Sequence, residues 1–336
     1  MRFRRAIRSS LSIILSLPLA SAAWGAELPK LGADPNKVSI SGLSSGAFMA
    51  VQYDVAFSAS TMGVGVVAGG PYNCTYVNLG GTKTCMEGSP IGIASYNAAL
   101  GFAMWGQINP VANIAKQKVY LFSGTSDIVV KQSVMDSVRD FYRLAKVPAA
   151  NLVYENKSDA GHAFISDAFG NACATNQPPY VNECTVGGSP YDQPAAILGH
   201  IYGPLKPKTK TLSAQPIPFD QTPYARPLSS LASTGYLYVP ANCRIAGTKC
   251  AVHVVFHGCL QSAESVGDAV YAKLGYNEWA DANDIIVLYP QVNKNILPIN
   301  PNGCWDWWGY SGLNFQTKSG TQLQAIHAMV ERLTSR

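Results

Sequence analysis

Charged residues are scarce in this sequence, and neither sign dominates. Asp, Glu, Lys and Arg make up 13% of the 336 residues, with 25 basic residues against 20 acidic ones. Four of the basic residues stand in an acid-free N-terminal stretch: Arg2, Arg4, Arg5 and Arg8. Proteins that bind nucleic acids by neutralising phosphates carry a large basic surplus, so we expect no nucleic-acid partner. Disorder is excluded as well, because 47% of the residues are hydrophobic.

No hydrophobic run is long enough to span a membrane. The apolar run at residues 11–20 is about half the ~20 residues that a membrane-spanning helix needs. It follows a basic start and precedes small residues at 21–23, which is the pattern of a secretory signal peptide. We therefore expect residues 1–25 to be a signal peptide, cleaved after Ala23 or Gly25. The mature protein is then secreted, extracellular or periplasmic, and not bound to a membrane.

Metal-binding spacings are missing too. No two cysteines form a C-x-x-C pair, and no cysteines and histidines are spaced as zinc ligands, so we expect neither a metal ion nor a cofactor. The eight cysteines are an even number in an exported chain, which favours disulfides. Proximity along the chain suggests three short loops and leaves one long-range pair: Cys74–Cys85, Cys173–Cys184, Cys243–Cys250 and Cys259–Cys304.

Strand-like and helix-like stretches alternate in the first half of the chain. Helical spacing predicts helices over 47–57 and 129–146, and β-prone or apolar runs predict strands over 38–41, 62–68, 119–123 and 152–155. Buried apolar runs between helices are typical of a mostly parallel sheet with helices on both faces. The sequence therefore predicts an α/β fold.

The second half begins with a different kind of segment. Residues 165–232 are rich in Pro, Gly, Asn and Ser and predict a long irregular excursion. Strands are predicted again over 235–239, 252–256 and 285–289, with a helix before the last and a final helix over 321–333. Internal repeats, low-complexity linkers and charge blocks are absent from the sequence. We therefore expect one catalytic domain over residues 26–336.

A nucleophile is indicated by the sequence Gly42-Leu43-Ser44-Ser45-Gly46, between a predicted strand and a predicted helix. In that context G-x-S-x-G is a nucleophile elbow, a sharp turn that exposes the Ser44 hydroxyl. The alternative is an ordinary Gly/Ser turn. A serine hydroxyl also needs a base, and the base needs an orienting acid.

Candidates for the acid and the base follow two other predicted strands. Asp127 comes just after the strand over 119–123, and His162 just after the strand over 152–155. Because the carboxyl ends of parallel strands meet at one sheet edge, we expect both residues near Ser44. Asp127 as a helix cap and Asp159 as a rival acid remain alternatives. His253 lies inside an apolar strand, where we expect a hydrogen-bonded core residue.

Ester hydrolysis also needs N–H donors for the oxyanion. The Ser45 amide follows the nucleophile and supplies one; the second normally comes from a His-Gly loop that precedes the serine in the chain. Here the segment with that form, His257-Gly258-Cys259, lies far downstream. If the Cys259 amide is the second donor, the fold is circularly permuted, which is tolerated where the original termini lie close together. The alternative is a strand end that reads His-Gly-Cys by chance.

These motifs resemble a known family. GLSSG, GTSD, GHAF, HGCLQ and NPNGCWDWWGY, in this order, resemble the polyhydroxybutyrate depolymerases with a circularly permuted, single-domain α/β-hydrolase catalytic domain. The resemblance runs from about residue 38 to the C-terminus. It implies depolymerisation of short-side-chain polyhydroxyalkanoates to oligomers and hydroxyacids. Many secreted members carry a linker and a separate polymer-binding module, and we expect no such module here.

The resemblance also implies residue roles: Ser44 as nucleophile, Asp127 as acid, His162 as base, the Ser45 and Cys259 amides as oxyanion hole, and a Cys259–Cys304 disulfide. If Cys304 is bonded to Cys259, the aromatic stretch beside it lies close to the oxyanion hole. Aromatic rings offer large apolar contact areas. We therefore expect substrate contacts from Asn302, Trp305, Trp307 and Trp308, the alternative being that one or two of the rings pack in the core.

The sequence thus predicts a monomeric serine esterase that acts on an aliphatic polyester or its oligomers. A secreted esterase of another substrate class, such as a feruloyl or acetyl polysaccharide esterase or another polyester hydrolase, would use the same triad. A non-catalytic binder with this fold is the third alternative.

Overall fold

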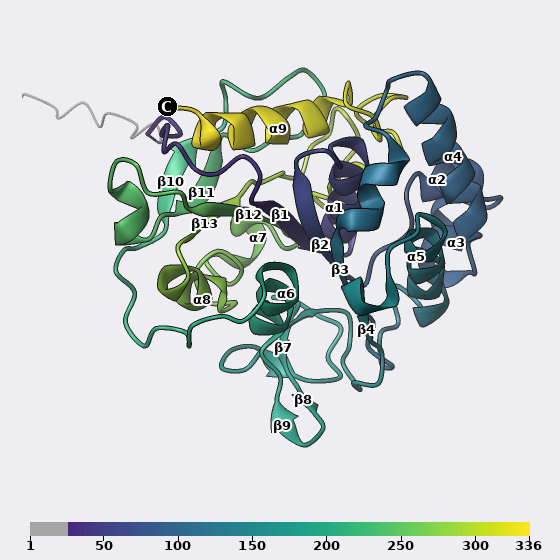
Figure 1. Ribbon diagram of the computed structural model, residues 1–336. Helices are drawn as coiled ribbons and strands as arrows, with labels where there is room; N and C mark the ends of the chain where they lie inside the picture. Colours follow the sequence, from purple (N-terminus) through teal and green to yellow (C-terminus); the bar gives the residue numbers. More distant parts are fainter. Residues whose placement is uncertain (1–25) are drawn as a thin grey trace, which may run out of the picture.

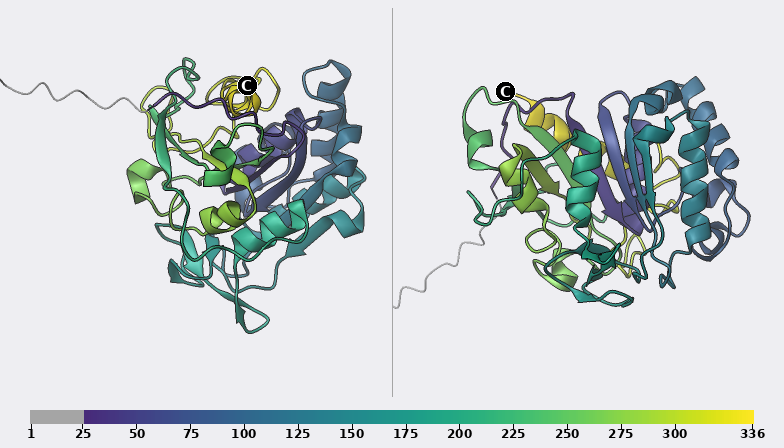
Figure 2. Two further views of the ribbon diagram at one scale, coloured as in Figure 1. Left: turned by 60° about the vertical axis from the view of Figure 1, so that its left-hand side comes forward. Right: turned by 60° about the horizontal axis from the view of Figure 1, so that its bottom comes forward.

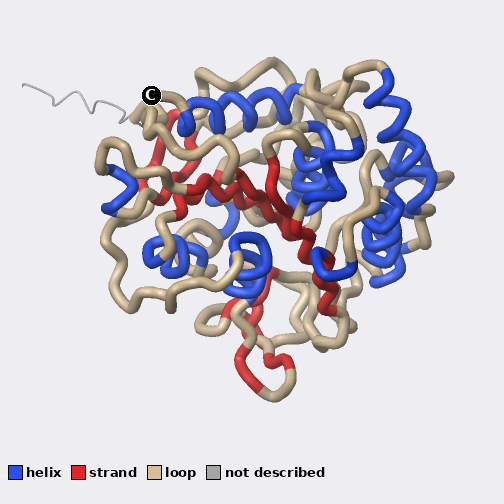
Figure 3. Tube along the Cα trace, in the orientation of Figure 1, coloured by secondary structure: helices blue, strands red, loops and turns tan. Residues whose placement is uncertain are grey.

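The computed structural model describes residues 26–336, so the predicted signal peptide lies outside the described residues. An eight-stranded sheet crosses the middle of the molecule and appears as a diagonal red band in Figure 3. Its strands, in spatial order, are β10 (Ile217–Asp220), β11 (Thr234–Tyr238), β13 (Ile285–Tyr289), β12 (Ala251–Phe256), β1 (Val38–Leu43), β2 (Thr61–Val67), β3 (Lys118–Phe122) and β4 (Leu152–Glu155).

The six strands from β13 to β4 run parallel, and β10 and β11 form an antiparallel edge. The central strands β1 and β12 are buried along their whole length. This burial is the reason that they read as continuous apolar runs in the sequence. All the predicted strands are confirmed to within two residues at their ends.

Helices cover both faces of the sheet (Figures 1 and 2). One core contains side chains of α1 (Ser45–Ala56), α4 (Gly92–Met104), α5 (Gln132–Leu144) and α9 (Thr321–Thr334). The opposite core contains side chains of α6 (Gln193–Tyr202) and α8 (Tyr276–Ala282). Successive strand residues alternate between the two cores; Leu121 belongs to the first and Tyr120 to the second. Short helices α2 (Cys74–Val77), α3 (Gly81–Glu87) and α7 (Ala263–Val266) lie in the connections.

The strand order is the one that a circular permutation predicts. Strand β12 comes late in the chain but pairs in parallel with β1, with Gly42 opposite Phe256. The turns that follow these two strands are therefore neighbours at the carboxyl edge of the sheet. This pairing brings the His257-Gly258-Cys259 segment beside the predicted elbow.

The prediction of an irregular excursion over 165–232 is wrong in part. Helix α6 lies inside it, capped by Asp192, whose carboxylate accepts the Ala195 N–H at 3.0 Å. Its apolar face, Ile197 and Leu198, packs on the sheet. The proline- and glycine-rich flanks hide this ten-residue helix in the sequence. The excursion also holds edge strand β10 and the short strands β5 (Phe164–Ser166), β6 (Asn171–Ala172), β7 (Val181–Glu183), β8 (Thr185–Val186) and β9 (Ser189–Pro190), the first of which begins one residue before it.

The eight cysteines form four disulfides, in the pairs that chain proximity suggests: Cys74–Cys85, Cys173–Cys184, Cys243–Cys250 and Cys259–Cys304. None of the helices within residues 26–336 has the length and apolarity to cross a membrane.

His253 is a core residue, as predicted: its ring nitrogens contact the Ser39 and Ser41 hydroxyls at 2.6 and 2.8 Å. Burial lowers its pKa to about 3, so the ring is neutral.

Candidate active site

Ser44 occupies a strained turn between β1 and α1. Its φ of 57° lies in the left-handed region, which is uncommon for a residue with a side chain. The helix that follows passes very close to β12, because a Cβ on Gly46 would lie 2.4 Å from the carbonyl oxygens of Phe256 and His257. Only glycine permits that approach. The turn therefore has the geometry of a nucleophile elbow, and Ser44 lines a cleft.

Asp127 and His162 form a buried hydrogen-bonded pair on the same edge. The Nδ1 atom of His162 lies 2.8 Å from Oδ2 of Asp127, and the side chains are 6% and 0% exposed. The other carboxylate oxygen accepts the backbone N–H groups of Val129 and Val130 at 2.8 and 2.9 Å. Because a carboxylate only accepts, Nδ1 carries a proton in this bond, and in the neutral tautomer of the ring Nε2 is the acceptor. The rival acid, Asp159, is exposed to solvent.

The turn after β12, which contains Cys259, lies beside the elbow: a Cβ on Gly258 would lie 3.4 Å from the Cβ atom of Ser44. The His257 Nδ1–H donates to the Gly258 carbonyl at 2.7 Å, and Nε2 accepts the Val292 N–H at 3.1 Å. Full burial lowers the pKa of His257 to about 4, so the ring is neutral and its tautomer is fixed. Since the C=O and N–H of a trans peptide point in opposite directions, the Cys259 N–H points away from His257. Both Ser45 and Cys259 line the cleft.

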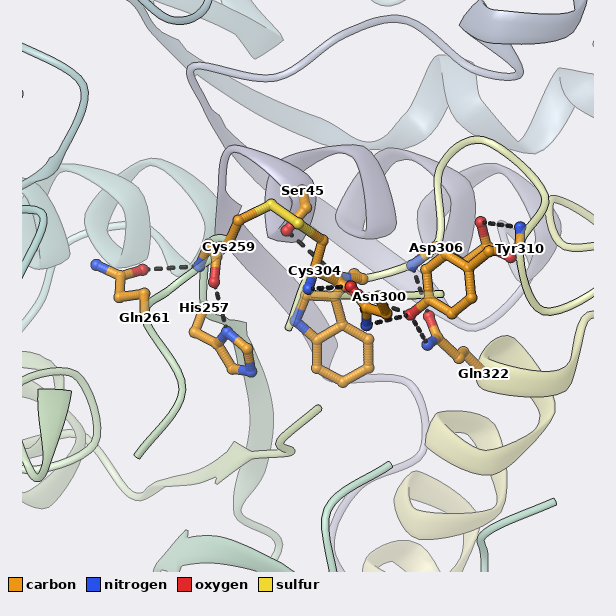
Figure 4. Close-up of a disulfide and its surroundings, with 11 residues drawn as sticks. Ser45, His257, Cys259, Gln261, Asn300, Cys304, Asp306, Tyr310 and Gln322 are labelled. Carbon is orange, nitrogen blue, oxygen red and sulfur yellow. Dashed lines mark hydrogen bonds between the residues drawn. A yellow bond between two sulfur atoms is a disulfide. The ribbon is translucent and has the colours of Figure 1, made fainter. Parts of the chain in front are cut away.

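The segment around residues 302–305 ties the two turns together (Figure 4). Cys304 is disulfide-bonded to Cys259, and the Trp305 N–H donates to the Ser45 hydroxyl at 3.3 Å. The Asn302 carbonyl accepts the Leu260 N–H at 2.7 Å. One short segment therefore holds both residues whose amides the sequence predicts as oxyanion donors.

An aromatic loop follows this segment and is built on Asp306. Its carboxylate accepts five hydrogen bonds, from the N–H groups of Trp308, Gly309, Tyr310 and Ser311 and from the Ser311 hydroxyl. Burial raises the pKa of Asp306, and these hydrogen bonds act against that shift. The turn directs Trp307 and Trp308 into the cleft wall. Trp307 stacks on Phe48 with ring centroids 4.3 Å apart.

Trp305 does not line the cleft, and the prediction that it does is wrong. Its side chain is fully buried and packs edge-on against Phe256, with centroids 5.0 Å apart. The N–H bond to Ser45 fixes its backbone, and the turn at Asp306 begins one residue later. Trp305 therefore packs in the core, whereas Trp307, two residues later, lines the cleft. Asn302, by contrast, does line the cleft.

The cleft has a volume of about 350 Å³ and is mostly apolar. Residues that sequence reasoning missed also line it: Phe48, Thr82, Met86, Val129, Val130, Tyr180 and Leu260. Two of these residues could have been found from the sequence. Phe48 lies one helical turn after Ser44, and Met86 is adjacent to the predicted disulfide partner Cys85.

Across residues 26–336, the one group with metal-ligand spacing is Cys243, Cys250 and Asp284, and its two sulfurs are joined in a disulfide.

A nucleophile elbow and an Asp–His pair at the carboxyl edge of this permuted sheet define the class of the protein: it has an α/β-hydrolase fold with a Ser-His-Asp arrangement. No protein-family model matches the chain. Comparison with curated proteins finds a poly(3-hydroxybutyrate) depolymerase of Delftia acidovorans, 44% identical over 316 residues, 92% of this chain and 62% of the relative. A polyhydroxybutyrate depolymerase of Talaromyces funiculosus is 39% identical over 324 residues and is matched over 92% of both chains.

Solved structures give the same result. The crystal structure of the depolymerase from Penicillium funiculosum matches with a TM-score of 0.85 and 37% identity, over 92% of this chain and 99% of that one. A depolymerase complexed with an R3HB trimer matches with the same values. The chain belongs to the polyhydroxybutyrate depolymerase family, and it spans somewhat less than two thirds of the Delftia relative.

Proposed function

We propose that this protein is a secreted serine esterase that hydrolyses the ester bonds of poly(3-hydroxybutyrate) and related short-chain polyhydroxyalkanoates. The single observation that carries the proposal is that Ser44 and His162, which is hydrogen-bonded to Asp127, line one apolar, tryptophan-walled cleft. Family membership supports the polyester substrate, as does the R3HB trimer bound by a structural neighbour. The four disulfides support an oxidising, exported location.

In the first half of the reaction, the Ser44 hydroxyl attacks the ester carbonyl. The Nε2 atom of His162 takes the proton, and Asp127 stabilises the imidazolium that forms. The Ser45 and Cys259 N–H groups stabilise the tetrahedral oxyanion, each worth about 3–4 kcal/mol of barrier. The intermediate collapses as His162 returns the proton to the leaving alkoxide, the hydroxyl end of the departing polymer segment. An acyl group remains on Ser44.

In the second half, water replaces the alcohol. The water molecule loses a proton to His162 Nε2 as its oxygen attacks the acyl carbon, and the same two amides hold the second oxyanion. Collapse releases the hydroxyacyl group as a carboxylic acid and restores the Ser44 hydroxyl with the proton from His162. These steps need only residues of this chain and water.

The cleft chemistry suits an aliphatic polyester. A chain of ester units presents methyl and methylene groups and no charge, and no Asp, Glu, Lys or Arg lines the cleft in the described part of the chain. Trp307 and Trp308 offer flat apolar surfaces without demanding hydrogen bonds. We further propose that residues 26–336 act as a single catalytic domain on the polymer and its oligomers.

Product analysis after incubation of the purified protein with a poly(3-hydroxybutyrate) film tests the proposal. We expect soluble 3-hydroxybutyrate and its oligomers, with none from the Ser44→Ala variant. A parallel incubation with wheat arabinoxylan tests the second esterase class. Ferulate release there, with an intact polyester film, would assign the cleft to polysaccharide esters instead.

A further inference from the structure

The loop closed by the Cys173–Cys184 disulfide contacts the three turns of the active site, although it supplies none of the residues that react. We call residues 173–184 the bracing loop. We propose that Asn176, three residues after Cys173, is a positioning residue that holds the Asp127 turn and the His162 turn in their relative positions. The inference rests on the proposed function, since it assigns Asp127 and His162 to catalysis.

The Asn176 side chain makes four hydrogen bonds. Its Oδ1 atom accepts the backbone N–H of His162 at 2.8 Å and that of Ile128 at 3.3 Å. Its Nδ2 atom donates to the Ser126 carbonyl at 3.0 Å and to the Ala174 carbonyl at 3.0 Å. Asp127 lies between Ser126 and Ile128, so one amide group bonds both neighbours of the acid and the backbone of the base. An amide satisfies this set because it offers an acceptor and a two-proton donor side by side.

The backbone reinforces the same contact. The Gly161 N–H donates to the Cys173 carbonyl at 2.8 Å, and a Cβ on Gly161 would lie 2.2 Å from the Thr175 carbonyl oxygen. The backbone of the bracing loop therefore packs directly against Gly161, the residue before His162. Further along, the Phe164 N–H donates to the Tyr180 carbonyl at 3.0 Å. The base turn is held on both sides of His162 by this loop.

The far end of the bracing loop reaches the turn after β12. The Gln261 amide nitrogen donates to the carbonyls of Pro179 and Tyr180 at 3.0 and 2.9 Å, while its Oε1 accepts the Gly258 N–H at 2.7 Å. Gln261 is completely buried. The bracing loop thus bonds the acid turn, the base turn and the oxyanion turn, which come from three different strands. A base that shifts by about 1 Å relative to its acid and nucleophile loses about a hundredfold in rate.

Asn171 provides a matched control. It lies just outside the bracing loop, and its Nδ2 atom donates to the Gln177 and Pro178 carbonyls at 3.2 and 3.3 Å. It bonds the loop but neither the Asp127 turn nor the His162 turn. If the substitutions only destabilise the loop, both Asn171→Ala and Asn176→Ala are affected. If the relative position of the Asp127 and His162 turns is what matters, only Asn176→Ala is affected.

The experiment measures kcat and KM for p-nitrophenyl butyrate against pH, together with the low-field proton resonance of His162 Nδ1–H. For Asn176→Ala we expect kcat to fall about tenfold to a hundredfold with KM within twofold, and the resonance to broaden or shift. Asn171→Ala should leave all three unchanged. Asn176→Asp keeps the acceptor but adds a negative charge near His162, which stabilises the imidazolium, so the acidic limb of the kcat profile should move to higher pH.

Wild-type kcat and resonance in Asn176→Ala would overturn the inference, as would an equal loss of kcat in Asn171→Ala. Failure of the proposed function looks different. If the wild-type protein hydrolyses p-nitrophenyl butyrate but leaves polyester intact, the polyester assignment is wrong. The comparison of Asn176→Ala with the wild type then still tests the positioning role. If it hydrolyses no ester, the His162 resonance alone decides the positioning role.

Discussion

Trp307 lies flat against Phe48, with ring centroids 4.3 Å apart and planes inclined by 19°. Phe48 belongs to the first turn of the helix that Ser44 begins, so the aromatic wall rests directly on the helix of the proposed nucleophile. Trp308 in turn packs edge-on against Trp307 at 5.4 Å. The wall that would hold a polyester chain and the turn that would cleave it therefore form one packed unit.

Replacing Ser44 with Ala should abolish ester hydrolysis and leave the fold intact. The loss in kcat for p-nitrophenyl butyrate should reach about 10⁴-fold or more, because no other group supplies the nucleophile. Ser60→Ala, beyond the far end of α1, is the control and should keep full activity. Near-complete hydrolysis by Ser44→Ala would contradict the elbow assignment, and a non-catalytic binder would keep its function in that variant.

Removing the Cys259–Cys304 disulfide should impair catalysis more than stability. The pair holds the Cys259 turn beside the elbow, so the double variant Cys259→Ser/Cys304→Ser should lose about tenfold or more in kcat as the second oxyanion donor becomes poorly placed. Cys243→Ser/Cys250→Ser is the matched control, because that disulfide lies at the opposite end of β12. Thermal unfolding of both variants separates the two effects. Equal kcat in both would show that the turn needs no such tether.

Asp306→Asn should weaken substrate binding selectively. The amide oxygen still accepts three backbone N–H groups, but Nδ2 then faces the N–H and hydroxyl donors of Ser311, which have no acceptor left. A loosened Trp307–Trp308 wall should raise KM for a methyl ester of the 3-hydroxybutyrate trimer by about tenfold, or ~1.4 kcal/mol. The kcat for p-nitrophenyl acetate should change little. Asp136→Asn on α5, at a half-exposed carboxylate that does not line the cleft, is the control, and an equal KM change there would refute the argument.

Asp54→Asn should stabilise the protein at alkaline pH. Burial raises the pKa of Asp54 to about 8, and its Oδ2 atom accepts the Tyr142 hydroxyl at 2.9 Å. The folded protein therefore retains a proton that the unfolded chain releases near pH 4. Stability is then lost as pH rises from about 4 to about 8, by up to ~5 kcal/mol. An asparagine is neutral at every pH, so Asp54→Asn removes this dependence of the free energy of unfolding on pH.

Urea unfolding at pH 4.5 and pH 8 measures the effect of Asp54→Asn. The wild type should be less stable at pH 8 than at pH 4.5 for this reason, and the variant should exceed it mainly at pH 8. Glu155 serves as a comparison, since Glu155→Gln alters a carboxylate that caps a turn at Lys157 and lies nearer the surface. A variant with the same pH slope as the wild type would show that Asp54 is ionised when buried.

The sequence predicts those parts of the candidate site that directly follow a strand. Ser44, Asp127 and His162 each follow an apolar strand, and parallel strands bring such residues to one edge whatever the loops do. The His-Gly-Cys segment indicated the permutation because it has the form of a loop that normally precedes the serine. These predictions needed only local patterns and one rule of sheet geometry.

Other features depend on contacts between distant segments, and no local pattern encodes them. The direction of Trp305 is decided by an N–H bond to Ser45, more than 250 residues away in the chain. Asn176 stands in a polar loop where an asparagine reads as an ordinary turn residue, and its role follows only from which backbone atoms meet its amide. Helix α6 was missed because its stability comes from packing on the sheet.

The permuted strand order has a consequence for the timing of activity. The elbow is synthesised early, whereas strand β12, the Cys259 turn and its partner Cys304 lie in the last third of the chain. A partly synthesised chain therefore carries Ser44 without the Cys259 amide that we propose as second oxyanion donor, and without the tryptophan wall. On the proposed mechanism, the active site is complete only when synthesis is nearly finished and Cys259 and Cys304 have been oxidised to their disulfide.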